Sequence, residues 1–160
     1  MGLERDITLI KTIPLFSFLP TDQLAMVAFS ATRQELAAGE VLFREGDDAA
    51  SGLAVLSGAV QLIAGTRTRR APILCGVGSL IGELALFVDA KRPASAVAVV
   101  PSAVLEIPRN TIVRLLTEYP ETAQRLHELV ADRLSAILAD LVAWSSAPAG
   151  AIDGEGAAAA

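Results

Sequence analysis

The chain has 160 residues, 52% of them hydrophobic and 19% charged, a balance that fits one folded domain and excludes a disordered chain. Its formal net charge of −5 lacks the basic surplus that neutralises phosphates in nucleic-acid-binding proteins, so we expect no nucleic-acid partner. The single cysteine (Cys75) and single histidine (His127) exclude an intrachain disulfide and most metal-dependent or Ser–His catalysis, so we expect no metal, no cofactor and no enzyme activity.

Two short helices are expected before the first strand. Residues 3–13 form the first, which stops before Pro14 because the residue preceding a proline is pushed out of the α region. The second begins near Thr21 and carries Leu24 and Val27 at helical spacing. The opening residues lack the apolar stretch of a signal peptide, and no apolar run reaches the ~18 residues of a bilayer span. We therefore expect a cytoplasmic protein without membrane insertion.

Short β-prone runs alternate with glycines through the middle of the chain. The runs cover residues 41–43, 53–56, 60–63, 96–100 and 103–107. Many short strands with turn signals every ~8–12 residues are typical of an all-β sandwich or roll, and nothing in the spacing suggests βαβ units. The sequence therefore predicts a mainly β domain with flanking helices.

Helical periodicity returns after the last strand, first over residues 111–118 and then from Pro120 to about Trp144. A proline suits the first turn of such a helix, because its missing N–H would have no helical partner there. The residues that follow are rich in Ala and Gly and have no periodicity, which is typical of a flexible end. We expect one domain over residues 1–144 and a flexible tail over residues 145–160.

The last helix carries apolar residues that step by four, three, four and three positions, as in a heptad seam. They are Val130, Leu134, Ile137, Leu141 and Trp144. Such a seam fits a homodimer formed by two paired last helices. It also fits packing of the same stripe on the chain's own strands, and the sequence leaves both open.

Residues 81–95 carry the candidate chemistry. Gly82 and Glu83 open a short apolar stretch that could form one helical turn, whose N–H groups attract an anion. Arg92 follows, and a guanidinium binds phosphate bidentately while a carboxylate accepts a hydrogen bond from a sugar hydroxyl. The alternatives are a surface ion pair between Arg92 and Asp89 and a purely capping role for Glu83.

This segment resembles the phosphate-binding cassette of the cyclic nucleotide-binding domain family, on the sequences Gly82-Glu83-Leu84-Ala85 and Arg92-Pro93-Ala94-Ser95. We call residues 82–95 the cassette. The family includes bacterial catabolite activators, protein kinase A regulatory subunits and nucleotide-gated channels. Residues 39–47 resemble its first β-roll strand and turn, and residues 55–60 its next hairpin. The resemblance covers roughly residues 13–141 and implies a double-stranded β-helix (a jelly-roll-like β-roll) with N-terminal helices and a long C-terminal helix.

The resemblance also implies a set of ligand-binding residues. They are Gly82, Glu83, Leu84, Ala85, Arg92, Pro93, Ala94 and Ser95. Glu83 would bind the ribose 2′-hydroxyl and Arg92 the cyclic phosphate. The amides around Leu84 and Ala85 would donate to phosphate oxygens, and Gly82 would let the backbone approach the ligand closely.

The second half of the cassette departs from the family pattern at one position. Ala94 and Ser95 would line the wall beside the phosphate and the base. The residue after the arginine commonly donates its backbone N–H to the phosphate, and here it is Pro93, which has no N–H. Loss of one such donor to a charged group costs ~1.5–3 kcal/mol of binding free energy.

Two functions follow from the resemblance. In the first, the chain is a sensory or regulatory module that binds cyclic AMP or cyclic GMP, and the ligand repositions the C-terminal helix. In the second, the fold has lost useful nucleotide affinity and acts as a dimerisation or interaction module, in keeping with Pro93 and the apolar last helix.

Overall fold

The structure, a computed structural model, describes residues 2–65 and 71–146. Three helical segments come first: α1 (Gly2–Thr12), the 3-10 helix η1 (Pro14–Phe16) and α2 (Thr21–Ser30). Ile13, between α1 and Pro14, has an extended backbone (φ −76°, ψ 124°), as expected for a residue before proline. Both predicted N-terminal helices are therefore present: α1 lies within one residue of its expected bounds, and α2 begins at the expected Thr21.

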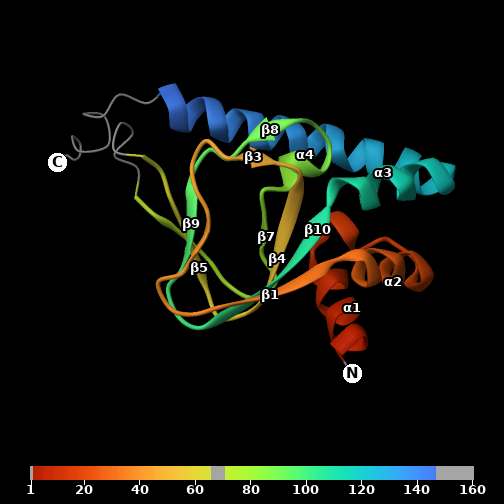
Figure 1. The fold of residues 1–160 in the computed structure, drawn as a ribbon. Coiled ribbons are helices and arrows are strands. Elements are labelled where there is room, and N and C mark those ends of the chain that lie inside the picture. The colour runs from red at the N-terminus through yellow and green to blue at the C-terminus, as the bar shows by residue number, and fades with distance from the viewer. Residues whose placement is uncertain (1, 66–70, 147–160) are drawn as a thin grey trace.

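Within the described residues, ten strands and one 3-10 helix follow. They are β1 (Thr32–Leu36), β2 (Val41–Phe43), β3 (Asp48–Ala49), β4 (Ser51–Ser57), β5 (Val60–Ile63), β6 (Ile73–Cys75), β7 (Leu80–Ile81), η2 (Glu83–Leu86), β8 (Ala90–Lys91), β9 (Ser95–Ala98) and β10 (Ser102–Pro108). Two four-stranded sheets, β1-β10-β4-β7 and β2-β9-β5-β6, face each other, and the two-stranded β3-β8 lies at one end (Figure 1). The described pairings are antiparallel, so the predicted β-roll is confirmed.

Strand β10 is a wall shared by two hydrophobic cores. Val104 points into the roll, where it shares a core with Val55 of the neighbouring strand β4 and Val60 of the facing sheet. Leu105 and Ile107, on the other face of the same strand, join the core formed with the helices. Alternate side chains of a strand point to opposite faces, so one strand can serve both cores. The helical layer is thereby fixed directly to the back of the roll.

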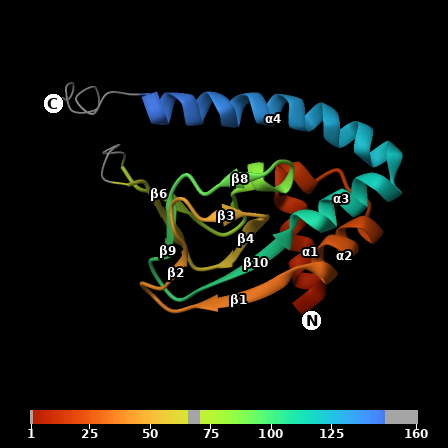
Figure 2. The same cartoon turned by 45° about the horizontal axis from the view of Figure 1, so that its top comes forward.

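Two helices complete the described chain: α3 (Arg109–Glu118) and α4 (Pro120–Ser146). The start of α4 packs against α3 and η1, with Leu126 buried in the helical core and Thr122 Oγ1 donating to Gln23 Oε1 at 2.7 Å. Figure 2 shows α4 running along the side of the roll that carries β8. The predicted long C-terminal helix is therefore confirmed.

The rest of the expected C-terminal features lie largely outside what the structure describes. Helix α4 is described through Ser146, and residues 147–160 of the predicted tail lie outside the described residues. The side chains of the seam from Val130 to Trp144 also lie outside them. None of the helices in the described chain is long and apolar enough to cross a bilayer.

Candidate ligand-binding site

The cassette begins with a bend that only glycine fits. Gly82, directly after β7, has φ +73° and ψ 36°, in the left-handed region that side chains disfavour. A Cβ placed on Gly82 would also overlap Nη1 of Arg92. The bend starts η2, and the chain then returns through β8 to Arg92. Gly82 is therefore required for its backbone conformation and for the close approach of the guanidinium.

A cavity of about 220 Å³ opens at this bend. Its lining residues are Ala49, Leu80, Gly82, Glu83, Leu84, Ala85, Ala90, Lys91, Arg92 and Pro93. Six of the eight residues that the resemblance implies thus surround one space. The other two lie outside the lining: Ala94 is buried, and Ser95 Oγ accepts a hydrogen bond from the Glu45 N–H at 2.9 Å.

Arg92 is the charged centre of this cavity. Its side chain is only 6% exposed, and its Cζ lies 4.3 Å from the centre of the Phe43 ring, a cation–π contact. Nη2 donates to Ser51 Oγ at 3.3 Å. Nη1 is buried beside Gly82 and has no hydrogen-bond partner among the residues that the structure describes. The alternative ion pair with Asp89 is absent, because Asp89 pairs with Arg109 instead.

Negative charges outside this cavity offset part of the cost of burying Arg92. Burial lowers the pKa of the guanidinium, whereas the negative charges of Glu106 and Asp47 raise it. Glu106 accepts hydrogen bonds from Ser51 Oγ at 2.7 Å and from Gln34 Nε2 at 2.8 Å. A second cavity, of about 540 Å³, contains Gln34, Ser51 and Glu106 in its lining, and Arg92 borders both cavities.

The amide and carboxylate groups of the cassette lie close to the same space. Glu83 is half-buried and is the first residue of η2. The Ala85 N–H donates to Gly82 O at 3.1 Å, which closes the turn. Lys91, which also lines the cavity, forms an ion pair with the exposed Asp48 across β3 and β8. This pair lowers the pKa of Asp48 and raises that of Lys91.

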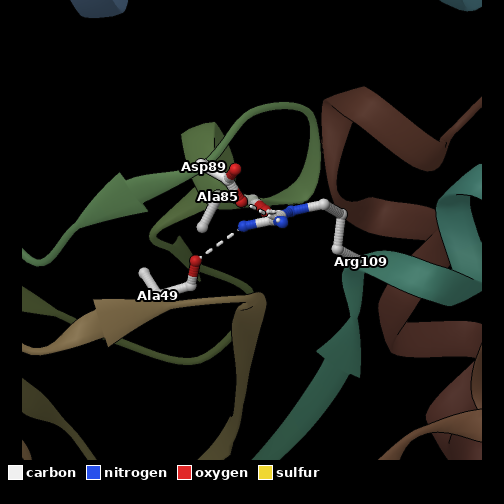
Figure 3. A network of polar contacts seen from close by, with 4 residues as sticks. All are labelled: Ala49, Ala85, Asp89 and Arg109. Atoms are coloured by element: carbon white, nitrogen blue, oxygen red, sulfur yellow. Dashed lines mark hydrogen bonds and ion pairs between the residues drawn. The ribbon is translucent and has the colours of Figure 1, made fainter.

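Arg109 ties the cassette to its surroundings. Nε donates to Ala85 O, Nη1 to Asp89 Oδ1 and Nη2 to Ala49 O, each at 2.7 Å (Figure 3). Ala85 and Ala49 line the cavity on different elements, so one guanidinium holds both. Arg109 is not among the site residues predicted from the sequence. Its position could have indicated a role. A cation at the first position of a helix is unfavourable beside the positive end of the helix dipole, so Arg109 at the start of α3 implies a compensating interaction.

Neither cavity shows a metal centre. No group of three or more His, Cys, Asp or Glu side chains in the described ranges, 2–65 and 71–146, is placed to hold a metal ion. The features of the 220 Å³ cavity are instead a buried cation, a carboxylate and a glycine-led turn. These are groups that recognise an anion carrying hydroxyls.

Comparison with known proteins agrees with the fold. The chain is 33% identical over 129 residues to the cyclic AMP receptor protein of Thermus thermophilus, a match covering 78% of this chain and 58% of that one. A solved cyclic nucleotide-binding-like protein from Brucella abortus is 35% identical, with a TM-score of 0.63 over 70% of this chain and 97% of that chain. The N-terminal domain of a transcriptional regulator from Streptomyces coelicolor is 31% identical, with a TM-score of 0.72 over 81% of this chain and 94% of that one.

The chain matches only part of the length of two curated relatives. The chain spans 58% of the length of the Thermus protein and 31% of that of a curated relative from Rhodopseudomonas palustris. The family profile described as "Cyclic nucleotide-binding domain" matches residues 33–119, which is more than half of the chain and includes the whole cassette. The chain therefore belongs to the cyclic nucleotide-binding domain family.

Proposed function

We propose that this chain is a regulatory module, without catalytic activity, that binds a 3′,5′-cyclic nucleotide in the 220 Å³ cavity. One observation carries the proposal: Arg92 is buried with Nη1 unpaired within the described chain and directed at the Gly82 turn. A buried cationic donor without a partner is costly, and a phosphate oxygen supplies a charge-assisted hydrogen bond. The name of the Thermus relative supports cyclic AMP as the first ligand to test, with cyclic GMP beside it.

In the proposed complex, residues from both ends of the cassette contact the ligand. Arg92 binds the cyclic phosphate, and Glu83 accepts from the ribose 2′-hydroxyl. The Leu84 backbone amide faces the phosphate, whereas the Ala85 N–H donates to Gly82 O within the turn. Ala94 and Ser95 lie outside the lining of the 220 Å³ cavity and would act only indirectly. The cavity is smaller than the ~300–1,000 Å³ of most small-molecule pockets. We therefore place the sugar-phosphate inside the cavity and the base outside it, toward solvent.

The proposed output is movement of α4. Arg109 is at once the first residue of α3 and the residue that holds Ala85, and α3 packs against α4. A ligand that alters the cassette therefore acts on the segment that leads into α4. Its effect is limited to its differential affinity for the two arrangements of that helix, typically ~1–3 kcal/mol.

A second candidate function is favoured by Pro93. The missing N–H at this position removes one phosphate donor, and a domain with too little nucleotide affinity would act through its surface alone. The two functions differ in one measurable property. A ligand that binds only the folded state must raise its melting temperature, and a domain without affinity shows no such rise.

Calorimetric titration of the full chain with cyclic AMP and cyclic GMP tests the proposal. We expect binding to the unaltered protein and a loss of about 2–5 kcal/mol of binding free energy in Arg92→Gln. The folded state of this variant should remain intact, because the guanidinium that is removed is buried and incompletely paired. Arg114→Gln is the control, since Arg114 is exposed on α3 and forms an ion pair with the exposed Glu118 one turn along the helix, at 3.8 Å.

The outcomes separate the two functions. Heat for at least one nucleotide, abolished in Arg92→Gln and kept in Arg114→Gln, supports the sensor. No heat and no thermal shift with either nucleotide at millimolar concentration would reject the sensor and leave the interaction module.

A further inference from the structure

A chain of polar side chains runs away from Arg92 on the side opposite Gly82. Arg92 Nη2 donates to Ser51 Oγ at 3.3 Å, Ser51 Oγ donates to Glu106 Oε2 at 2.7 Å, and Gln34 Nε2 donates to Glu106 Oε1 at 2.8 Å. Ser51 is only 5% exposed, so this link is shielded from water. The carboxylate is thus held by two neutral donors, one hydroxyl away from the buried guanidinium.

Glu106 lies outside the 220 Å³ cavity in which we propose that the nucleotide binds. It is in the lining of the 540 Å³ cavity and not in that of the 220 Å³ cavity, whereas Arg92 borders both. The other negative charge that acts on Arg92, Asp47, is exposed and accepts a hydrogen bond from the Arg44 N–H in its own turn. Charges near the surface are screened by water and salt more strongly than partly buried ones. Glu106 is therefore the better shielded of the two.

We propose that Glu106 is the resting counter-charge of Arg92 and sets nucleotide affinity without touching the nucleotide. The inference rests on the proposed function, because it concerns the phosphate that Arg92 would bind. In the unliganded protein Glu106 offsets the burial of the guanidinium. When the phosphate arrives, a second negative charge approaches the same cation, and Glu106 repels it. The residue thus stabilises the unliganded protein and weakens binding.

This role gives two effects of opposite sign in one variant. Glu106→Gln keeps the size of the side chain and groups that can hydrogen-bond with Ser51 and Gln34, but it removes the charge. We expect nucleotide affinity to rise about 3- to 10-fold, because the repulsion across a partly buried path is lost. We expect the melting temperature of the unliganded protein to fall, because Arg92 loses its counter-charge. A merely structural role for Glu106 would lower both quantities.

The matched control is Glu35→Gln. Glu35 is on β1, next in sequence to Gln34, and its substitution makes the same change in net charge. Its side chain is exposed, and its ion pair is with the half-exposed Arg33 at 3.0 Å. Exposed ion pairs contribute little to the free energy of folding. Both the nucleotide affinity and the melting temperature of Glu35→Gln should therefore stay near those of the unaltered protein.

A second arm tests the counter-charge without any nucleotide. The melting temperatures of the original protein, Glu106→Gln, Arg92→Gln and the double variant form a cycle that isolates the interaction of the two residues. We expect Glu106→Gln to lower the melting temperature when Arg92 is present and to leave it unchanged or raise it in the Arg92→Gln background. Equal losses in both backgrounds would overturn the inference.

The two arms keep the inference distinct from the proposed function. If the original protein binds a nucleotide and Glu106→Gln binds it equally or more weakly, the affinity role is wrong and the sensor stands. If no nucleotide binds, the sensor is wrong, the affinity role falls with it, and the cycle still decides whether Glu106 balances Arg92.

Discussion

At the scale of single residues, the site depends on one buried cation and on the space made for it. Arg92 packs on Phe43 and donates to Ser51, and its remaining Nη1 lies against the backbone of Gly82. The glycine does two things there: it adopts a positive φ, and it leaves room for the guanidinium. The two requirements can be separated by experiment, because Gly39 also has a positive φ but an added Cβ there would meet no neighbouring atom.

Gly82→Ala should therefore weaken nucleotide binding more than its effect on stability explains. The left-handed backbone costs ~1–2 kcal/mol of folding free energy, and the new Cβ displaces the flexible end of Arg92. The control is Gly39→Ala, where φ is +85° and nothing lies within 4 Å of the added Cβ. Urea unfolding should give similar losses for both variants, and calorimetry a loss of affinity only for Gly82→Ala. Equal affinities would contradict the account of the bend.

Parts of this site were open to prediction from sequence, and parts were not. Gly82, Glu83 and Arg92 lie in one short segment that resembles a family motif, so a shared role for them could be predicted from the sequence. The links from Arg92 to Ser51 and from Ser51 to Glu106 join residues 41 and 55 positions apart. The Ser51–Glu106 link exists because β10 pairs with β4, which places Glu106 opposite Leu53. Nothing in the local sequence of Glu106 reports that pairing.

At the scale of elements, the strands that could be predicted from the sequence are those that contain a continuous run of apolar residues. The expected runs 41–43 and 60–63 coincide with β2 and β5, and 103–107 lies within β10. Strand β1 was not expected, because its sequence Thr-Arg-Gln-Glu-Leu is mostly exposed and lacks an apolar alternation. The two-residue strands β3 and β8 are too short for any period, so their pairing follows from the fold around them.

The element that ties these short strands to the helices is the first turn of α3. Arg109→Gln should lower the free energy of unfolding by about 1–3 kcal/mol, because it removes partly buried, charge-assisted hydrogen bonds to Ala85 and Ala49. Hydrogen exchange should quicken at the Phe87 and Val88 amides, which close η2. Arg109→Lys should rescue little, since an ammonium lacks the planar fork. Unchanged exchange in η2 would show that Arg109 does not hold the cassette.

At the scale of the whole molecule, α4 has one half whose contacts are described and one half whose role rests on sequence. Near its start, Leu126 is buried and Thr122 bonds to Gln23 of α2. Farther along, the heptad seam from Val130 to Trp144 is known from spacing alone. A helix anchored at one end and carrying an apolar seam beyond is typical of a dimerisation helix.

We therefore expect a homodimer in solution. Light scattering should give twice the 16.6 kDa mass of the chain. Leu134→Glu places a charge in the seam and should yield a monomer that keeps the fold of the roll, as judged by circular dichroism. Leu126→Glu is the contrasting variant, because this buried side chain packs on its own domain and its loss should unfold the protein. A monomer mass for the unaltered chain would rule out the dimer.

The double-faced strand β10 also decides how this molecule responds as a unit. Val104 on one side and Leu105 on the other are parts of a single rigid segment, so the interior of the roll and the helical layer cannot loosen independently. We expect stabilisation of the roll by a bound molecule to extend through β10 to the helical layer. Leu126 of α4 belongs to the same helical core as Leu105, so occupancy of the roll would reach the start of α4 through one shared strand.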